Sequence, residues 1–478
     1  MVATKRKITI NPVTRIEGHG KITLHLDDEG RVSDAKFHVT SFRGFEKFSE
    51  GRLFWEMPLI TPRICGICPV SHHLASAKAC DAIMGVEIPP TAAKLRRLMH
   101  MAQFVQSHSL HFFYLASPDL LFGMDSDPAK RNIIGVVEAN PELAKVGVGL
   151  RSFGQRIIET LGSKRVHPNF AIPGGVNRAL LPEERDSFLK ETDGVIKNIQ
   201  LALSIVKDYC AKAGKELDLF ASFPTGYLGL VDENGNLELY DGKLTLKDSK
   251  GIVLEDKVDP RNYLSIIEER VEDWSYLKFP FYKKMGYPAG IYRVGPLARL
   301  NVASGISTPL AAKEFKEFKK LAPNGMVQGS LYYHYARMIE DLYAAEELKS
   351  LLLDKDICSQ DLHTTSTQFN EEGVGVVEAP RGTLIHHYWV DSSGRITKAN
   401  LIVSTGNNNP AMNRAVLEVA RRYVDGTNLK EGMLNRLEVA IRCYDPCLSC
   451  SAHALGQMPL LVQLLSPTGE VVDEAVRG

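Results

Sequence analysis

Two Cys-x-x-Cys pairs near opposite ends of the chain constrain its fold more than any other feature. Cys65 and Cys68 form the first pair, Cys447 and Cys450 form the second, and 379 positions separate Cys68 from Cys447. A two-residue gap lets both sulfurs of a pair bind one ion. If both pairs bind the same metal, the fold must bring the two ends of the chain together. We therefore expect a large fold that closes around a site with four thiolates.

The thiolates do not identify the metal by themselves. Thiolate is a soft ligand suited to zinc, to an iron-sulfur cluster or to nickel in a sulfur-rich site. A structural zinc is the simplest alternative, but zinc ribbons place their second pair much closer to the first. Charged residues are also embedded in apolar sequence at Glu17, Arg63, Arg381 and Asp445, and buried charges need partners or a function. The pattern favours an active site.

Hydrophobic periodicity predicts a mainly helical protein with small sheets. Alternating apolar and polar positions from about 5 to 40, around the turn Asp27-Asp28-Glu29-Gly30, predict a β-hairpin or a short sheet. Apolar residues at three- and four-residue spacing predict helices over 70–84, 91–115, 138–161, 182–213, 311–321, 331–353, 412–424 and 432–441. Small inserted sheets are expected over 227–258 and 374–403. The fold class is therefore α+β, predominantly helical, with a large helical core and small peripheral sheets.

Composition limits the partners and the cellular location that we expect for the protein. Lys plus Arg and Asp plus Glu both number 57, so the whole chain has no excess charge for binding nucleic acid. The N-terminus has no apolar segment after its basic residues, and no stretch reaches the about 20 apolar residues that span a bilayer. We therefore expect a cytoplasmic protein without a membrane span. Four isolated cysteines are expected to be inert core residues: Cys80, Cys210, Cys358 and Cys443.

The residues around the paired cysteines resemble a known family. The first pair lies in Arg63-Ile64-Cys65-Gly66-Ile67-Cys68, followed by His72, and the second in Asp445-Pro446-Cys447-Leu448-Ser449-Cys450, followed by His453. These stretches are similar to the two signatures of nickel-iron hydrogenase large subunits. The similarity continues at Arg15-Ile16-Glu17-Gly18-His19, Phe42-Arg43-Gly44-Phe45-Glu46, Ala379-Pro380-Arg381-Gly382 and Ser404-Thr405. Within the family the chain resembles the cytoplasmic NAD-reducing bidirectional group most, which implies the large-subunit fold and reversible cleavage of H2 to protons and electrons.

The resemblance implies a set of metal ligands and a proton acceptor. Cys65 and Cys447 match terminal nickel ligands, while Cys68 and Cys450 match the cysteines that bridge nickel to an iron carrying carbon monoxide and cyanide. Hydrogen is then split heterolytically between the metal and a base. Glu17 matches the proton-relay glutamate of the family, and an ordinary surface carboxylate is its alternative interpretation.

Other positions match residues that surround the centre. Arg381 matches an arginine held over the open coordination side, where a fixed guanidinium stabilises charge, and a structural salt bridge is the alternative. Pro380 and Ser404 match the pocket that holds the cyanides, although Val403 stands where many relatives have proline. His72 matches a histidine that hydrogen-bonds near a bridging sulfur.

A second, hard-metal site is implied near the C-terminus. Glu46 and His453 match ligands of a magnesium-type site that pins the end of the chain. Asp445, which precedes the second cysteine pair, is expected to support the metal ligands without binding the metal itself.

The segment after His453 raises the question of maturation. Residues 454–478 follow that histidine, and in the family a maturation endopeptidase cuts after the matching position. The resemblance therefore implies one catalytic unit over 1–453 and a C-terminal extension over 454–478 that is removed. The extension is not expected to contribute to the core.

The electron acceptor must lie on other chains. The isolated cysteines cannot build a row of iron-sulfur clusters, and the chain has no Gly-x-Gly-x-x-Gly nucleotide loop. The resemblance implies a small subunit with iron-sulfur clusters, together with diaphorase subunits that bind FMN and NAD. Coupling to NADP or to a deazaflavin coenzyme stays open. A metal-free quinone-site subunit of the complex I type is a further alternative, but that class lacks the four cysteines.

Overall fold

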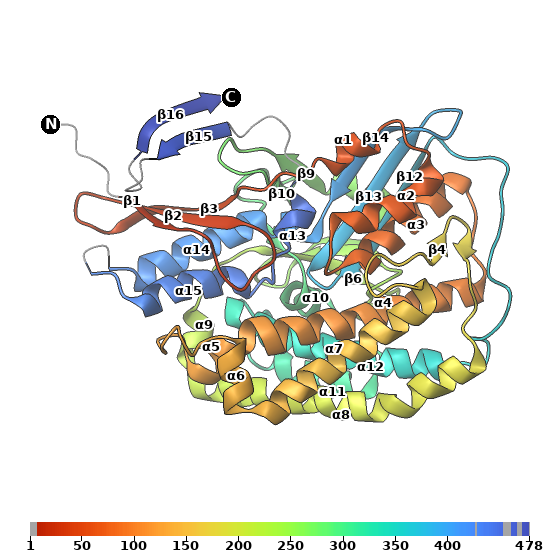
Figure 1. The fold of residues 1–478 in the computed structure, drawn as a ribbon, viewed down its shortest axis with the longest axis horizontal. Helices are drawn as coiled ribbons and strands as arrows, with labels where there is room; N and C mark the ends of the chain where they lie inside the picture. The colour runs from red at the N-terminus through yellow and green to blue at the C-terminus, as the bar shows by residue number, and fades with distance from the viewer. Residues whose placement is uncertain (1–6, 426–427, 453–459, 466–470, 478) are drawn as a thin grey trace.

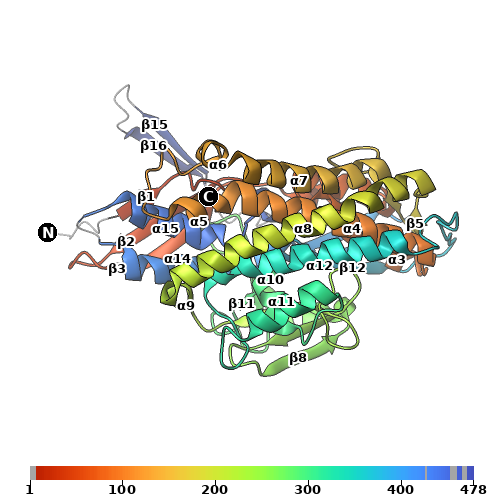
Figure 2. The ribbon, with the colours of Figure 1, turned by 90° about the horizontal axis from the view of Figure 1, so that it is seen from below.

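A layer of long helices forms one side of the molecule (Figure 1). The computed structural model describes residues 7–425, 428–452, 460–465 and 471–477. The long helices are α4 (Pro90–Leu110), α7 (Pro141–Gly162), α8 (Pro182–Ala213) and α12 (Tyr333–Leu353). Figure 2 shows them side by side, and at about 1.5 Å per residue they are about 30 to 50 Å long. The predominantly helical α+β architecture expected from the sequence is confirmed.

A three-stranded sheet places the helix that follows the first cysteine pair. The antiparallel strands β12 (Glu372–Ala379), β13 (Gly382–Val390) and β14 (Ile396–Ile402) pack against α3 (Pro69–Met84). Gly375 allows this contact, because a Cβ there would lie 2.0 Å from the carbonyl oxygen of Ala75 on α3. Cys68 is the N-cap residue of α3. The sheet therefore supports the element on which Cys68 lies.

Two other sheets confirm the predicted β regions and extend them. The N-terminal sheet is antiparallel and consists of β1 (Lys7–Ile10), β2 (Gly20–Leu26) and β3 (Val32–Val39). The second sheet has the order β11-β6-β7-β8, with β6 (Gly226–Val231), β7 (Lys243–Lys247), β8 (Val253–Val258) and β11 (Tyr292–Arg293). The predicted β region over about 5–40 contains β1, β2 and β3, whereas the parallel strand β11 lies outside both predicted insertions.

Shorter elements connect these layers. The helical ones among the described residues are α1 (Phe45–Ser49), η1 (Phe54–Glu56), α2 (Met57–Ile60), η2 (Thr61–Ile64), η3 (His111–Ala116), α5 (Ser117–Phe122), α6 (Ile133–Ala139), α9 (Lys215–Leu219), η4 (Pro260–Ser265), α10 (Pro296–Val302), α11 (Pro309–Lys319), η5 (Ser330–Tyr332), α13 (Ser404–Asn407), α14 (Asn409–Tyr423), α15 (Glu431–Arg442) and α16 (Leu448–Ser451). The remaining strands pair as β4 (Ala171–Ile172) with β5 (Gly175–Val176), β9 (Ile267–Arg270) with β10 (Phe279–Tyr282), and β15 (Leu460–Leu465) with β16 (Val471–Arg477). Within the described ranges, every helix is too short or too polar to span a bilayer.

Two predicted helices differ from the structure, and proline explains both differences. The helix expected over 138–161 is divided at Asn140, because α6 ends at Ala139 and α7 begins with Pro141. The helix expected over 91–115 ends at Leu110 and continues as the π-helical turn η3. Pro118 follows in α5, and a proline cannot donate a backbone hydrogen bond to the preceding turn. The other predicted helices are confirmed to within a few residues.

The two ends of the chain meet through a buried ion-pair group. Asp119 in α5 is 4% exposed and lies 2.6 Å from Nη2 of Arg15 and 2.6 Å from Nη1 of Arg442. Arg15 comes two residues before Glu17, and Arg442 ends α15, five residues before Cys447. One carboxylate therefore ties the N-terminal segment and the approach to the second cysteine pair to the helical layer.

Replacing Asp119 with alanine should lower the free energy of unfolding by about 3–5 kcal/mol, because the buried Arg442 and the partly buried Arg15 lose a counter-charge. Burial raises the pKa of Asp119, but Arg442 and Arg15 outweigh burial and hold the pKa below its ordinary value of 3.8. The stabilisation is therefore present above about pH 4 and is lost as the pH falls through the lowered pKa. Denaturation followed by circular dichroism measures it.

Asp125 offers a matched control for this prediction. It forms a 2.5 Å ion pair with Arg436, but its side chain is 71% exposed. Exposed pairs contribute less than about 1 kcal/mol, so Asp125→Ala should have a small effect. Equal losses for the two variants would contradict the role assigned to Asp119.

Candidate metal centre

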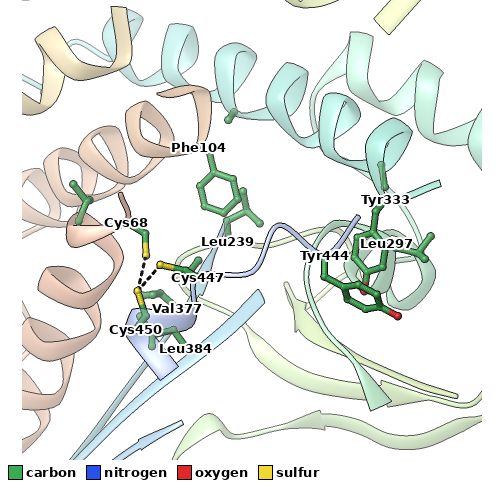
Figure 3. Packing of buried hydrophobic residues seen from close by; sticks show 14 of the residues in the cluster. Cys68, Phe104, Leu239, Leu297, Tyr333, Val377, Leu384, Tyr444, Cys447 and Cys450 are labelled. Atoms are coloured by element: carbon green, nitrogen blue, oxygen red, sulfur yellow. Dashed lines mark hydrogen bonds between the residues drawn. The ribbon is translucent and has the colours of Figure 1, made fainter. Parts of the chain in front are cut away.

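The four paired cysteines meet where the ends of the chain converge. Cys65 is the C-cap residue of η2, Cys68 is the N-cap of α3, and Cys447 is the N-cap of α16, which contains Cys450. Their Sγ atoms all lie within 4.8 Å of one another, and each residue is at most 5% exposed. Figure 3 shows Cys68, Cys447 and Cys450 pointing toward a common point. In the part of the chain that the structure describes, this is the single group of three or more His, Cys, Asp or Glu side chains close enough together to hold a metal ion.

The electrostatics of the cluster fit a soft cation. Burial raises the pKa of Cys65, but hydrogen bonds from the other three thiols lower it well below its ordinary value. The backbone N–H groups of Ile67 and Cys68 also point at this sulfur, at 3.2 and 3.1 Å. Burial and the neighbouring sulfurs hold the pKa values of Cys447 and Cys450 well above their ordinary value. A bound metal replaces thiol protons, so four converging buried sulfurs suit nickel, iron or zinc.

Glu17 lies on the N-terminal segment, directly beside the second cysteine pair. Its backbone forms a parallel bridge with Cys447, and Leu448 N donates to Glu17 O at 3.2 Å. The Cys447 thiol donates to its Oε2 at 3.0 Å, and Ser449 Oγ donates to its Oε1 at 2.6 Å. Gly18 permits this approach, because a Cβ there would lie 2.8 Å from Leu448 Cβ. Glu17 is partly buried, and its carboxylate contacts a sulfur of the cluster.

Arg381 places a fixed positive charge close to the sulfurs. Its guanidinium is buried, Nε donates to Asp445 O at 2.6 Å, and Nη2 lies 3.0 Å from Asp445 Oδ2. Nη1 donates to Ser107 Oγ at 3.4 Å. Burial alone would lower the pKa of Arg381, but Asp445 and the nearby thiol groups raise it well above its ordinary value. The residue thus forms a salt bridge and also lies next to the cysteines, which combines the two interpretations made from the sequence.

The other predicted neighbours are buried around this group. His72 lies in the first turn of α3, with Nδ1 3.1 Å from His386 Nε2. Ser404 begins α13 and is 4% exposed, and Pro380 directly precedes Arg381. Val403 has φ −85° and ψ 142°. These angles are close to those of polyproline II, so the valine keeps the backbone conformation that a proline would favour.

The residues expected to bind magnesium are placed only in part. Both carboxylate oxygens of Glu46 lie near Lys278 Nζ, at 3.0 and 3.2 Å, and Leu401 N donates to Oε1 at 2.8 Å. Glu269 lies 3.4 Å from the same ammonium group. His453, the second expected ligand, lies outside the described residues. Glu46 therefore has a cationic partner that the sequence did not indicate.

Four further residues at the site were missed by the sequence analysis. Thr405 Oγ1 accepts from Cys447 N at 2.9 Å, and Ser449 binds Glu17. His167 Nε2 lies 3.1 Å from the carbonyl oxygen of Cys65, and Lys278 binds Glu46. Ser449 lies inside the second cysteine motif and Thr405 directly follows Ser404. Both could therefore have been predicted as site residues from their positions in the sequence. His167 and Lys278 come from distant segments, and no sequence pattern marks them as site residues.

Two family models match most of the chain. A model described as nickel-dependent hydrogenase matches residues 43–131 and 230–453. A second model, described as HoxL-like, matches residues 7–42. The matched ranges contain all four clustered cysteines, Glu17 and Arg381.

Individual relatives cover nearly the whole chain. The beta subunit of the NAD-reducing hydrogenase HoxS from Cupriavidus necator is 48% identical over 99% of this chain and 100% of its own length. One chain of the F420-non-reducing hydrogenase vhc from Methanococcus voltae is 44% identical over 96% of this chain and 97% of its own length. Among solved structures, an NAD+-reducing NiFe hydrogenase in the H2-reduced state is 45% identical, with a TM-score of 0.91 over 94% of this chain and 99% of that one.

Proposed function

Because this chain belongs to the nickel-dependent hydrogenase family and is the catalytic subunit of a nickel-iron hydrogenase, we propose that it converts H2 reversibly to protons and electrons for an NAD-reducing complex. The convergence of four buried sulfurs beside Glu17 and Arg381 carries this proposal. A structural zinc site has no need for a partly buried carboxylate hydrogen-bonded to a ligand sulfur or for a buried guanidinium. Heterolytic chemistry needs both a base and a stabilising charge.

The cysteines divide into two roles in this proposal. Cys65 and Cys447 would hold nickel, and Cys68 and Cys450 would hold nickel together with an iron of the kind that carries carbon monoxide and cyanide. When bound, such a centre supplies the redox and Lewis-acid chemistry that cleaves H2. The protein holds the four sulfurs together on η2, α3 and α16 and keeps them away from water.

Glu17 transfers the proton between the centre and solvent. Its Oε2 accepts from Cys447 Sγ at 3.0 Å, which is within the reach of a general base. Ser449 fixes the other oxygen at 2.6 Å, so the carboxylate is held against the sulfur. Since Glu17 is only partly buried, it can pass on a proton that it takes from the sulfur side.

Arg381 and its neighbours shape another part of the site. The guanidinium is held by Asp445 and stabilises negative charge as H2 is polarised. Pro380 and Ser404 would line the pocket for the cyanide ligands of such a centre. His72 acts through the sulfurs by hydrogen bonding and does not bind the metal.

Electrons leave through partner subunits. The cysteines outside the cluster lie apart from it, and Cys80 and Cys443 are buried with their pKa values raised by burial, so they are inert thiols. We propose a small subunit with iron-sulfur clusters and diaphorase subunits that bind FMN and NAD, working in the cytoplasm. The similarity to NAD-reducing relatives supports NAD as the acceptor. The methanogen relative supports a second candidate, in which the same catalytic chain serves a complex with a different acceptor.

An assay of the purified complex under H2 separates these candidates. NADH should form when NAD is supplied, and the deazaflavin coenzyme should not be reduced at a comparable rate. NADP tests selectivity between pyridine nucleotides. Hydrogen-dependent reduction of a viologen dye without reduction of either pyridine nucleotide would reject the NAD-reducing complex and leave the hydrogenase activity in place.

The hard-metal site depends on the C-terminal end of the catalytic unit. We propose that Glu46 and His453 bind magnesium and so pin residue 453 to the body of the protein. Oxygen is the preferred ligand of magnesium, and Glu46 supplies two oxygens. Lys278 already neutralises this carboxylate, so magnesium binding requires the ammonium group to move aside.

The extension over 454–478 should be absent from active enzyme. We propose that an endopeptidase cuts after His453, which leaves the catalytic unit 1–453, and the match to the nickel-dependent hydrogenase model ends at the same residue. Intact-mass spectrometry of an active, nickel-loaded sample is the measurement, and it should give a chain that ends at His453. A full-length chain in such a sample would contradict the proposal.

A further inference from the structure

Arg381 lies in an unusually constrained turn. β12 ends at Ala379 and β13 begins at Gly382, and these two residues pair with each other, so Pro380 and Arg381 alone form the turn. Gly382 has φ 137°, and a Cβ there would lie 2.1 Å from a methyl group of Val294. The side chain of Arg381 is directed to Asp445 and the sulfurs. The protein can therefore fix the position of Arg381 by hydrogen bonds to the backbone carbonyl groups that precede it.

Arg299 binds two of these carbonyl groups. It lies on α10, its Nη1 donates to Ala379 O at 2.9 Å, and its Nη2 donates to Pro380 O at 3.2 Å. The same guanidinium contacts Glu340 through Nε and Nη2, both at 2.6 Å, and Glu378 through Nη1 at 2.7 Å. All five N–H groups of the fork can thus be satisfied at once. Arg299, Glu340 and Glu378 are all 0% exposed.

The two carboxylates are themselves held in place. Glu340 Oε2 lies 3.1 Å from Nε2 of His108 on α4, and Glu378 Oε1 accepts from Thr383 Oγ1 at 2.8 Å. Burial lowers the pKa of His108 to about 4, so this ring is neutral at neutral pH. Glu340 belongs to α12 and Glu378 to β12. Arg299 therefore connects the turn of Arg381 to the long-helix layer and to the sheet.

From this geometry we infer that Arg299, clamped between Glu340 and Glu378, is a positioning residue for Arg381. It holds the carbonyl groups of Ala379 and Pro380 and so fixes where the guanidinium of Arg381 lies relative to the four sulfurs. This inference rests on the proposed role of Arg381. Buried ion pairs of this kind are a weak source of net stability, since desolvation offsets much of their attraction. A geometric role accounts for keeping three charges in a fully buried site.

Lysine substitution tests the fork geometry while it keeps the charge. Arg299→Lys leaves one ammonium group to replace five N–H donors, so it cannot hold both carboxylates and both carbonyl groups. In the purified complex we expect kcat for H2 oxidation to fall about 100-fold, the size of effect that a 1 Å misplacement causes. KM should change little, because Arg381 acts on the chemical step. Nickel and iron content and the melting temperature are measured on the same samples.

Arg96→Lys is the matched control. Arg96 is also 0% exposed, donates to the carbonyl groups of Ile172 and Gly175, and pairs with Asp81 at 2.6 Å. It therefore reports the general cost of the same change at a buried site that binds no part of the Arg381 turn. We expect a comparable fall in melting temperature for both variants and a large fall in kcat for Arg299→Lys alone.

A double-mutant cycle with Arg381→Lys decides whether Arg299 acts through Arg381. Arg381→Lys alone should lower kcat about 10²–10³-fold, and adding Arg299→Lys should cause no further fall. If the two losses multiply, Arg299 does not act through Arg381 and the inference is rejected. If Arg381→Lys leaves kcat unchanged, the proposed role of Arg381 fails first. If only Arg381→Lys lowers kcat, the inference alone fails.

A milder variant keeps the test decisive if Arg299→Lys does not fold. Glu378→Gln preserves shape but cannot accept from Arg299 and also from Thr383 and Leu230 N with the same two atoms. It should lower kcat in the same direction as Arg299→Lys, by less, with normal metal content. The loss should again disappear in the Arg381→Lys background. A wild-type kcat for Glu378→Gln would overturn the inference.

Discussion

Replacing Cys450 with serine should abolish H2 conversion. Cys450 Sγ lies 2.7 Å from Cys447 Sγ and 3.8 Å from Cys68 Sγ, so it completes the group of four sulfurs. A serine hydroxyl is a harder and far less acidic ligand than a thiol, so it does not replace a thiolate ligand of a soft metal. We expect activity to fall to background and the nickel content to fall with it. Metal analysis and a hydrogen-uptake assay on the same purified complex measure both effects.

Cys80→Ser is the control for the chemical change itself. Cys80 is also fully buried on α3, and its thiol donates to Phe54 O at 3.1 Å, a hydrogen bond that a serine hydroxyl can keep. This variant should retain metal and activity. Full activity in Cys450→Ser, or equal loss in both variants, would contradict the assignment of the cluster as the metal centre.

Replacing Glu17 with glutamine should slow turnover by about 10²–10⁴-fold, the usual contribution of a positioned proton-transfer group. Glutamine has the same shape and can still accept from Ser449, but it cannot carry a proton away from Cys447. The metal centre should remain, because Glu17 is not one of its ligands. We therefore expect normal nickel and iron content, an unchanged melting temperature and a large fall in kcat, measured as H2 oxidation and as isotope exchange between H2 and D2O.

Glu438→Gln is the matched control for Glu17→Gln. Glu438 also joins the N-terminal segment to the second half of the chain, since it accepts from Thr14 N at 2.8 Å and from Arg442 at 3.4 Å. It is not hydrogen-bonded to a cysteine of the cluster. Its substitution should leave kcat near that of the wild type. If Glu17→Gln is as active as Glu438→Gln, proton transfer follows another route.

Local sequence patterns predicted most of the elements because their signals are local. The long apolar period over 182–213 and the turn at Asp27–Gly30 both correspond to observed structure. The end of α4 was missed, since the helical period continues across the π-helical turn while Pro118 changes the hydrogen bonding. Strand β11 was missed because two residues carry no period at all. A single proline or the tertiary packing sets the backbone conformation in these two cases. Hydrophobic periodicity carries no signal for either of them.

The residues of the candidate site were predictable where they belong to a short sequence motif. The four cysteines and Glu17 lie in distinctive short stretches, and the structure brings them within hydrogen-bonding distance. Lys278 and His167 were not predictable, because their contacts come from segments more than 100 positions away from their partners. Arg299 had one usable signal, a charge inside the apolar run Gly295-Pro296-Leu297-Ala298-Arg299. The partner of a buried charge, however, is known only once the fold is known.

The most direct test of the metal centre is an infrared spectrum of the purified complex in the region of metal-bound carbonyl and cyanide stretching, with metal analysis of the same sample. We expect carbonyl and cyanide bands together with nickel and iron. Bands with iron but without nickel would identify a precursor in which the extension over 454–478 is still attached. Zinc without any such bands would contradict the hydrogenase centre and would make the four cysteines a structural site.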